Sequence, residues 1–447
     1  MSAQRKSVAG APAPGGEVSG ASFLATARRV HRTLLDRLDL RRIDVRSMTD
    51  TALREVVGTH VQAILETVGS GSEAERAQLF DFVMNEALGL GALEVLLADA
   101  GISEIMINGV NNVFVERQGR LARAPSLFSG PSALEGIIER IMAYTGRRLD
   151  ESVPMADTRL PDGSRVNIII PPVAVRGACI TIRKFSKKVL SLAELCAAGS
   201  MSQEMRAFLE LCVRERRSIV VSGGTGSGKT TLLNALSNVI PEAERIVTVE
   251  DAAELQLCHE NLVTLEARPA NIEGKGVVSI RDLVRNALRM RPDRIVVGEC
   301  RGGEALDMLQ AMNTGHNGSM TTAHANSPRD LLSRLEVMVL MSGMELPVSA
   351  IRQQMASAID IIVQQARFPT GERRLTSISE VTGIEAGTIQ LQELYRLRRR
   401  GTAGGAPGAQ FENCGNVPAF FEELRAQGRV PVFRPGRAGD GEESARP

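Results

Sequence analysis

The residues most able to do chemistry lie in the segment IVVSGGTGSGKT, residues 219–230. An apolar, β-branched run precedes a glycine-rich loop in which Gly223, Gly228, Lys229 and Thr230 have the spacing G-x-x-x-x-G-K-[ST], the P-loop pattern. Glycines allow consecutive backbone N–H groups to turn inward around a phosphate, which side chains would obstruct. The following TLLNALSNVI has helical spacing, so the loop opens a helix whose N-terminus also favours an anion. The segment therefore predicts binding of a nucleotide phosphate.

Each part of this loop has an expected role. Lys229 would reach the β- and γ-phosphates of a nucleotide, and the Thr230 hydroxyl would bind a Mg²⁺ ion. The alternative is a glycine-rich strand-to-helix turn with a chance Lys-Thr pair. It is disfavoured because the strand, the full spacing and the helix coincide. The residues expected to contact the nucleotide are Gly223, Gly224, Thr225, Gly226, Ser227, Gly228, Lys229, Thr230 and Thr231.

Two acidic residues downstream of the loop are candidates for hydrolysis of the nucleotide. Hydrolysis needs a carboxylate that orients the attacking water, and a further carboxylate or hydroxyl for the metal, at the C-terminal ends of parallel strands near the loop. The apolar run of residues 295–297 is followed by Gly298 and Glu299, and the run of residues 246–249 ends in Glu250. One apolar run that ends in an acid is a weak motif. Two of them in the same domain as a P-loop favour a hydrolytic site.

Histidines and arginines near these acids add further candidates. His316 and His324 lie in the polar segment NTGHNGSMTTAHANS, which supplies no core, so a role in phosphate sensing or coupling is preferred over packing. Arg281, Arg285 and Arg289 recur every four residues of a predicted helix and form one basic stripe. Salt bridges across a subunit or domain face explain that stripe as well as direct contact with a nucleotide does.

The periodicity of apolar residues predicts the elements that position these side chains. Residues 22–97 have the helical spacing of a small bundle, and residues 98–190 combine alternating strands, turns and one helix, which predicts a small α+β domain. Residues 191–398 alternate strand-like and helical segments, which predicts a mostly parallel sheet flanked by helices. The composition of residues 1–21 predicts a disordered tail, and that of residues 399–447 a linker and a mostly disordered tail with one short helix in VPAFFEELRAQG.

Composition excludes or disfavours several classes of protein. A chain of 447 residues is too long for one ordinary core, and 53 Lys and Arg against 52 Asp and Glu leave it nearly neutral. Six scattered cysteines without a C-x-x-C pair fit reduced thiols in a cytosolic protein and exclude a zinc ribbon. Because no run of about 18 apolar residues and no signal-peptide pattern occur, any membrane association should be peripheral. With 3% aromatic residues and no Trp, the chain has little material for stacking on nucleic acid.

Taken together, these motifs resemble the secretion-superfamily ATPases, and specifically the CpaF family that powers assembly of tight-adherence (Tad) pili. Four motifs match in order, namely GGTGSGKT, VTVEDAAEL, RMRPDRIVVGECRGGEALDMLQAMNTGH and GSMTTAHANSPRDLLSRLE. The upstream segments ISEIMING, DTRLPDGSRVN and TIRKF are also similar to the N-terminal domain of that family. The resemblance implies an α/β fold with a RecA-like P-loop ATPase domain, ATP and Mg²⁺ as ligands, and a homo-hexameric ring.

The resemblance also implies roles for single residues. Glu250 would be the catalytic glutamate, and Glu299 the Walker B acid that binds Mg²⁺ together with Thr230. His324 would be the histidine-box residue beside Lys229 in the catalytic set. Arginines of the α+β domain would complete the site, although each is equally well explained as a solvated charge. The candidates are Arg165 and Arg183, with Arg159 behind them.

The family further implies a cytoplasmic protein, peripheral at the inner face of the inner membrane, that binds polytopic platform proteins of a pilus machine. Several alternatives stay open. Many type II secretion and type IV pilus extension motors carry a tetracysteine zinc motif, which this chain lacks, whereas a type IV secretion ATPase is harder to dismiss. A RecA-like DNA translocase is disfavoured by the balanced charge and scarce aromatic residues. A nucleotide switch without hydrolysis is disfavoured by the complete set of acids.

Overall fold

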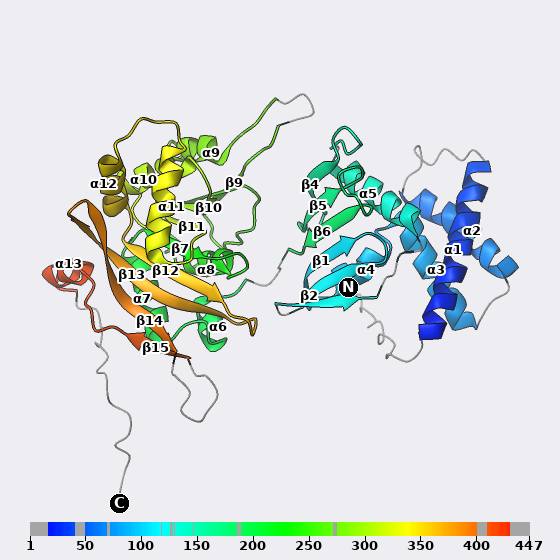
Figure 1. Cartoon of the computed structure of the whole chain (residues 1–447), viewed down its shortest axis with the longest axis horizontal. Coiled ribbons are helices and arrows are strands. Elements are labelled where there is room, and N and C mark those ends of the chain that lie inside the picture. Colours follow the sequence, from blue (N-terminus) through cyan, green and yellow to red (C-terminus); the bar gives the residue numbers. More distant parts are fainter. Residues whose placement is uncertain are drawn as a thin grey trace, which may run out of the picture. The chain divides into compact units, whose positions relative to one another are not determined.

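The computed structural model describes residues 17–40, 50–68, 72–117, 119–125, 128, 130–145, 147–185, 189–270, 275–399 and 409–429. The chain divides into two compact units, residues 1–186 and 187–447, which we call the N-terminal unit and the C-terminal unit (Figure 1). Each is described by itself. No helix among the described residues is both long and apolar enough to span a membrane.

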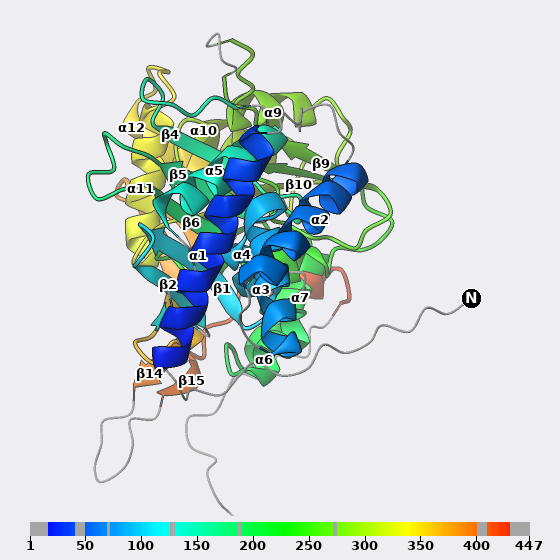
Figure 2. The same ribbon diagram turned by 90° about the vertical axis from the view of Figure 1, so that its right-hand side faces the viewer.

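Three helices begin the N-terminal unit: α1 (Glu17–Leu40), α2 (Asp50–Val68) and α3 (Glu73–Leu88). Figure 2 shows them side by side, and their apolar stripes form one buried cluster that includes Val30, Val61 and Val83. The expected tail of residues 1–21 is wrong at its end, because α1 already begins at Glu17. Downstream turns of α1 are buried against α2 and α3, and helix formation is cooperative, so the helix extends into small-residue sequence. Residues 1–16 lie outside the described residues.

A six-stranded antiparallel sheet forms the rest of the N-terminal unit, in the order β3-β2-β1-β6-β5-β4. Buried residues alternate with more exposed ones along β2, β4, β5 and β6, so one face of the sheet packs on the helices α4 and α5 and the other carries polar side chains. The elements are α4 (Ala92–Ala98), β1 (Ile102–Asn108), β2 (Val113–Arg117), β3 (Arg120–Ala124), α5 (Pro131–Thr145), β4 (Met155–Arg159), β5 (Arg165–Ile169) and β6 (Cys179–Arg183).

The C-terminal unit is built on a nine-stranded sheet in the order β15-β14-β13-β12-β7-β11-β10-β8-β9. Strands β12 to β9 in this order are parallel, and β13, β14 and β15 extend the sheet with antiparallel pairs. The elements are α6 (Leu192–Ala197), α7 (Gln203–Arg214), β7 (Ile219–Gly223), α8 (Lys229–Ser237), β8 (Ile246–Glu250), β9 (Leu262–Glu266), α9 (Ile280–Ala287), β10 (Arg294–Cys300), α10 (Glu304–Asn313), β11 (Met320–Ala323), α11 (Pro328–Leu340), α12 (Val348–Ala358), β12 (Ile361–Arg367), β13 (Arg373–Glu385), β14 (Thr388–Arg399), β15 (Ala409–Asn413) and α13 (Phe420–Ala426).

Helices cover both faces of this sheet, which is why its central strands are continuous apolar runs. All five residues of β7 are buried, as are all five of β8. One face packs on α6, α7, α8 and α13, and the other packs on α9, α10, α11 and α12. The predicted mostly parallel sheet flanked by helices is therefore present.

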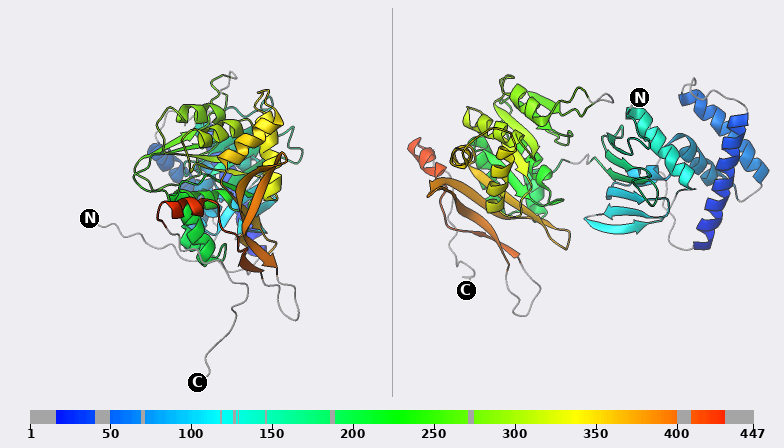
Figure 3. Two further views of the ribbon diagram at one scale, coloured as in Figure 1. Left: turned by 90° about the vertical axis from the view of Figure 1, so that its left-hand side faces the viewer. Right: turned by 45° about the horizontal axis from the view of Figure 1, so that its top comes forward.

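The C-terminal end of the chain differs from the prediction for residues 399–447. The predicted short helix is present as α13, whereas β15, which pairs with β14, replaces part of the expected linker (Figure 3). The rings of Phe420 and Phe421 pack against Phe208 of α7, with ring centroids 6.3 and 6.5 Å from it. The burial of these two rings holds α13 against the domain, although a Gly-rich stretch of sequence precedes it. Residues 400–408 and 430–447 lie outside the described residues.

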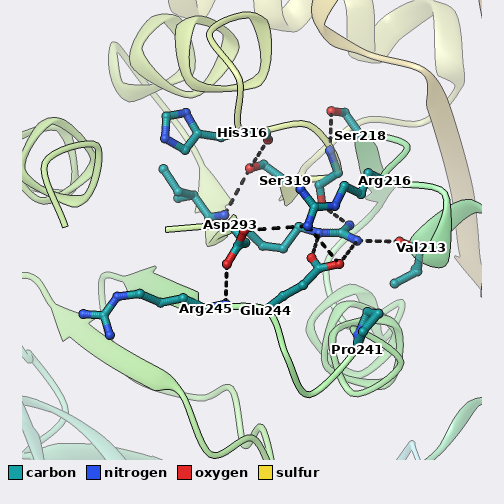
Figure 4. Close-up of polar contacts among 12 residues, drawn as sticks. Val213, Arg216, Ser218, Pro241, Glu244, Arg245, Asp293, His316 and Ser319 are labelled. Atoms are coloured by element: carbon teal, nitrogen blue, oxygen red, sulfur yellow. Dashed lines mark hydrogen bonds and ion pairs between the residues drawn. The ribbon is translucent and has the colours of Figure 1, made fainter. Parts of the chain in front are cut away.

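A buried arginine anchors the edge at which the parallel strands begin. Arg294, the first residue of β10, is 0% exposed. Its Nε donates to Glu244 Oε2 (2.6 Å), its Nη1 to the Gly318 carbonyl (3.0 Å) and its Nη2 to the Val213 carbonyl (2.8 Å). Figure 4 shows this network, in which Arg216 also approaches Glu244 at 3.3 Å. Arg294 thus ties the end of α7 and the segments before β8 and β11 to the start of β10.

Candidate active site

Four neighbouring parallel strands bring the candidate residues to one edge of the sheet. The strands are β7, β11, β10 and β8, in that spatial order. The glycine-rich loop follows β7, His324 follows β11, Glu299 lies near the end of β10 and Glu250 ends β8. Because the carboxyl ends of parallel strands meet at the same edge, residues from four separate segments converge there.

The loop between β7 and α8 has the backbone shape of a phosphate-binding loop. Gly226 and Gly228 have φ of 69° and 96°, in the left-handed region that glycine adopts without strain. The Ser227 hydroxyl is buried, with the residue 1% exposed, and has no hydrogen-bond partner among the described residues. Lys229 is folded back so that its Nζ donates to the Gly224 carbonyl at 3.1 Å. These groups fit a nucleotide polyphosphate, whose oxygens would accept hydrogen bonds from the Ser227 hydroxyl and the Lys229 ammonium group.

Lys229, His324, Glu299 and Arg301 form a chain of polar contacts. Nζ of Lys229 lies 3.3 Å from Nδ1 of His324, and Nε2 of His324 lies 2.9 Å from Oε1 of Glu299. Oε2 of Glu299 accepts from Nη2 of Arg301 at 2.9 Å. Burial and the Lys229 charge lower the pKa of His324, an effect that Glu299 opposes. These effects favour a neutral imidazole, one of whose ring nitrogens accepts from Lys229, whose Nζ lies 3.3 Å from Nδ1 and 3.4 Å from Nε2.

Glu250 sits in a more apolar environment than the other acid. It is 3% exposed, and burial raises the pKa of its carboxyl to about 7 even though the N–H groups of Glu254 and Leu255 donate to it at 3.0 and 3.1 Å. Its side chain crosses toward β10, where a Cβ at Gly298 would lie 2.9 Å from its Cγ. A carboxyl that titrates near neutral pH is suited to accept a proton from water.

The other predicted residues of the loop lie at the start of α8 or at the tip of the loop. Thr230 is half-buried in the first turn of α8, whereas Thr225 and Thr231 are exposed. Gly223 ends β7 and is buried. The expected contacts of these residues with ATP and of Thr230 and Glu299 with Mg²⁺ stay predictions.

The candidate arginines of the N-terminal unit form one row across three adjacent strands. Arg159 of β4 pairs with Arg165 of β5, which pairs with Arg183 of β6. Directly opposed residues of antiparallel strands share a face, and the neighbours Val166 and Ile182 point into the core, so the three arginines lie on the polar face of the sheet. Their predicted catalytic contribution stays a prediction.

His316 lies at the wrong end of its strand for the predicted phosphate contact. It precedes β11, and its carbonyl accepts from the Ser319 hydroxyl at 2.7 Å, at the edge where the strands begin (Figure 4). A strand of four residues, roughly 13 Å of chain, separates it from His324 at the other edge. The polar context of the two histidines is alike, so sequence alone did not distinguish them.

The basic stripe of α9 is mostly used within the domain. Arg281 and Arg285 both bind the buried carboxylate of Asp307 on α10, at 2.8 and 2.7 Å. Arg281 also donates to the Ser342 carbonyl. The stripe therefore docks α9 on α10, whereas Arg289 is exposed.

The sequence reasoning missed three residues beside the glycine-rich loop. Gln365 and Arg367 end β12, and Arg373 begins β13. Nε of Arg373 donates to the Gly226 carbonyl at 2.9 Å, and Gln365 is the register partner of Gly223. A signal was available, because these polar residues follow a buried apolar run, Ile361–Val363, just as Glu299 does.

Comparisons with known proteins found relatives in bacterial secretion and conjugal transfer. The family model "Type II/IV secretion system protein" matches residues 86–387. The conjugal transfer protein TrbB of Rhizobium radiobacter is 35% identical over 68% of this chain and 91% of its own length. The type IV secretion system protein PtlH of Bordetella pertussis is 36% identical over 64% of this chain and 91% of its own length. The solved VirB11 ATPase of the Brucella suis type IV secretion system is 31% identical over 64% of this chain and 92% of that chain, with a TM-score of 0.36.

The predicted fold class is confirmed: the C-terminal unit is an α/β, RecA-like P-loop domain. The family model covers well over half of the chain, and it includes the glycine-rich loop, both acids and His324. The chain belongs to the type II/IV secretion system protein family, in which the matched relatives are secretion-system ATPases.

Proposed function

We propose that this protein hydrolyses ATP to ADP and phosphate and couples that reaction to assembly of a tight-adherence (Tad) pilus, as a motor of the CpaF family. The observation that supports hydrolysis is the convergence of Lys229, His324, Glu299 and Glu250 at the carboxyl edge of four adjacent strands. Binding alone would need only the loop. The two carboxylates beside it are what a hydrolytic site adds.

In this proposal each side chain has one task. The loop N–H groups and Lys229 bind the β- and γ-phosphates, and Thr230 with Glu299 holds Mg²⁺, which neutralises developing phosphate charge when bound. Glu250 orients the attacking water and accepts its proton, a task that its raised pKa suits. His324 contacts both Glu299 and Lys229 and so keeps the two side chains beside each other.

The proposal includes a homo-hexamer in which arginines from an N-terminal unit complete the site. Arg165 and Arg183, with Arg159 beside them, form a row of positive charge on the polar face of their sheet. Such a row suits contact with a polyphosphate, because guanidinium groups bind phosphate oxygens in a bidentate manner. We further propose that the protein acts at the cytoplasmic face of the inner membrane on polytopic platform proteins.

A second candidate function is favoured by the names of two relatives, which are a conjugal transfer protein and a type IV secretion protein. Deletion of the gene, followed by complementation, separates the two candidates. Loss of surface pili with intact conjugation and secretion supports the Tad motor, and the opposite result supports the type IV secretion motor.

The test of the reaction uses two variants of the purified full chain. We expect Lys229→Ala to lose nucleotide binding, and Glu250→Gln to bind ATP while phosphate release falls by at least about a hundredfold. Glu266→Gln is the matched control, because Glu266 is the exposed register partner of Glu250 on β9. Unchanged phosphate release by Glu250→Gln would remove Glu250 from the mechanism. The mass of the assembly, measured in parallel, tests the hexamer.

A further inference from the structure

We propose that the hairpin of β12 and β13 sets the shape of the phosphate-binding loop, and that Arg373 is a positioning residue for nucleotide binding. The inference rests on the proposed function, because it concerns the same nucleotide site. It assigns a role to the segment of residues 365–373, which contributes no acid or histidine to that site.

The hairpin touches the loop at each of its three spaced glycines. A Cβ at Gly223 would lie 2.3 Å from the Gln365 carbonyl oxygen, and one at Gly226 would lie 3.2 Å from Nη1 of Arg367. A Cβ at Gly228 would lie 3.1 Å from Cδ of Arg373 and 3.3 Å from Nε2 of Gln365. A side chain at any of these three positions would therefore meet the hairpin, whereas Gly224 has open space around it.

The contact between Arg373 and Gly226 controls the direction of an N–H group. Nε of Arg373 donates to the Gly226 carbonyl at 2.9 Å. That carbonyl belongs to the same planar peptide as the N–H of Ser227, and in a trans peptide the two point in opposite directions. By holding the carbonyl outward, Arg373 holds the Ser227 N–H on the inner side of the loop. There the N–H donates to the Gly224 carbonyl at 3.3 Å, an acceptor that a phosphate would replace.

The charge of Arg373 adds to this geometric effect. A hydrogen bond from a guanidinium to a carbonyl is charge-assisted, and it polarises the peptide so that its N–H becomes a better donor. The Ser227 hydroxyl next to it is buried without a partner among the described residues, so the same residue offers a second donor. Arg373 lies behind the loop and touches its carbonyl, so it acts on phosphate through Ser227.

The next residue along the strand supplies a matched control. Arg374 has the same charge and length, but successive side chains of a strand point to opposite faces. Its Nη2 binds Glu372 at 2.8 Å, away from the loop. A general effect of removing one arginine from this hairpin would therefore appear equally in Arg373 and Arg374 variants.

The experiment compares the dissociation constant of MgADP, by calorimetry on the full chain, for wild type, Arg373→Ala, Arg373→Lys and Arg374→Ala. We expect Arg373→Ala to weaken binding at least about tenfold, Arg373→Lys to bind with intermediate affinity, and Arg374→Ala to match wild type. In ATP hydrolysis, KM should rise for Arg373→Ala while kcat at saturating ATP stays within about twofold, because the residue touches no reacting atom. Arg373→Met, which keeps the side-chain stem, replaces Arg373→Ala if that variant does not fold.

Two outcomes would overturn the inference. One is an unchanged dissociation constant in Arg373→Ala and Arg373→Met, and the other is equal weakening by Arg374→Ala. A lower thermal midpoint with unchanged affinity would show that Arg373 stabilises the hairpin without positioning the loop, which also overturns it. Wild-type protein that binds MgADP but does not hydrolyse ATP would refute the proposed hydrolysis, whereas the comparison of affinities would still test Arg373.

Discussion

Replacing Glu250 by Gln should stabilise the protein at the same time as it stops hydrolysis. Burial raises the pKa of the Glu250 carboxyl from its ordinary 4.5 to about 7, so the folded protein favours the neutral form. Below pH 4.5 the carboxyl is neutral in both the folded and the unfolded chain and costs nothing. As pH rises from 4.5 to about 7 the unfolded chain ionises first, and stability is lost across that window. Above about pH 7 the buried carboxylate is ionised, and its full cost in unfolding free energy is present.

The size of the penalty follows from the two pKa values. A difference of about 2.5 pKa units at about 1.4 kcal/mol per unit gives about 3 kcal/mol at pH 8. The glutamine amide is neutral at every pH, and its oxygen can still accept from the N–H groups of Glu254 and Leu255. Glu250→Gln should therefore raise the free energy of unfolding at pH 8 by up to about 3 kcal/mol, and by close to zero at pH 4.5.

The assay follows the thermal midpoint of the C-terminal unit in the full chain at pH 5 and pH 8, without nucleotide or Mg²⁺. The midpoint difference between Glu250→Gln and wild type should grow by roughly 5–10 °C from pH 5 to pH 8. Glu266→Gln, on the exposed partner position of β9, should show a much smaller change between the two pH values, because Glu266 adds only a minor repulsion to the Glu250 carboxyl. A Glu250→Gln difference that does not change with pH would refute the reasoning, because the carboxyl would then carry no burial penalty.

Two further substitutions test what holds the C-terminal unit together. Arg294→Met removes four hydrogen bonds and leaves the carboxylate of Glu244 buried, so it should lower the urea unfolding free energy by about 3–5 kcal/mol. Arg216→Met, at a side chain 46% exposed, should cost less than about 1 kcal/mol. Equal losses of unfolding free energy in Arg294→Met and Arg216→Met would show that burial does not determine how much an ion pair with Glu244 stabilises the protein. Phe421→Ala should cost about 3–5 kcal/mol by the same assay and the exposed Val417→Ala less than about 0.5 kcal/mol, and a negligible loss from Phe421→Ala would mean that α13 is no part of the core.

The two acids could be predicted because each stands at or near the end of a buried strand that is largely an apolar run, whereas His324 was singled out from its polar segment, since its strand Met320–Ala323 contains two threonines. Such runs are typical of parallel strands covered on both faces, and parallel strands place whatever follows them at one edge. The sequence pattern of each strand therefore predicted that these side chains lie close together. The prediction needed only the parallel arrangement of the strands, because their order in the sheet does not change which edge the side chains reach. The contact between His324 and Glu299 at 2.9 Å is the detailed form of that prediction.

The parts that sequence did not predict depend on pairing between segments. The hairpin of β12 and β13 carries Arg373 to the loop only because β12 lies beside β7, and nothing in the spacing of polar residues fixes that neighbour. Helix α13 was predicted as an element, but its place was not, because the helix packs on the ring of Phe208, about two hundred residues earlier in the chain. The Gly-rich composition before β15 indicated a linker. Composition alone does not tell whether the residues after such a linker pack on the domain.

The cationic side chains at the two edges of the parallel sheet have different partners. This difference explains why His324 is a candidate for the nucleotide site and His316 is not. At the edge where the strands begin, the Arg294 guanidinium donates hydrogen bonds to a buried carboxylate and two backbone carbonyls. A ligand that bound this guanidinium would have to break those hydrogen bonds. At the other edge the Lys229 ammonium contacts the Gly224 carbonyl and a neutral His324, at 3.1 and 3.3 Å. A phosphate can replace those neutral partners with gain, because an anion binds an ammonium group more strongly than a neutral acceptor does. A histidine beside the first network can only pack, whereas one beside Lys229 can respond to the charge that arrives with a nucleotide.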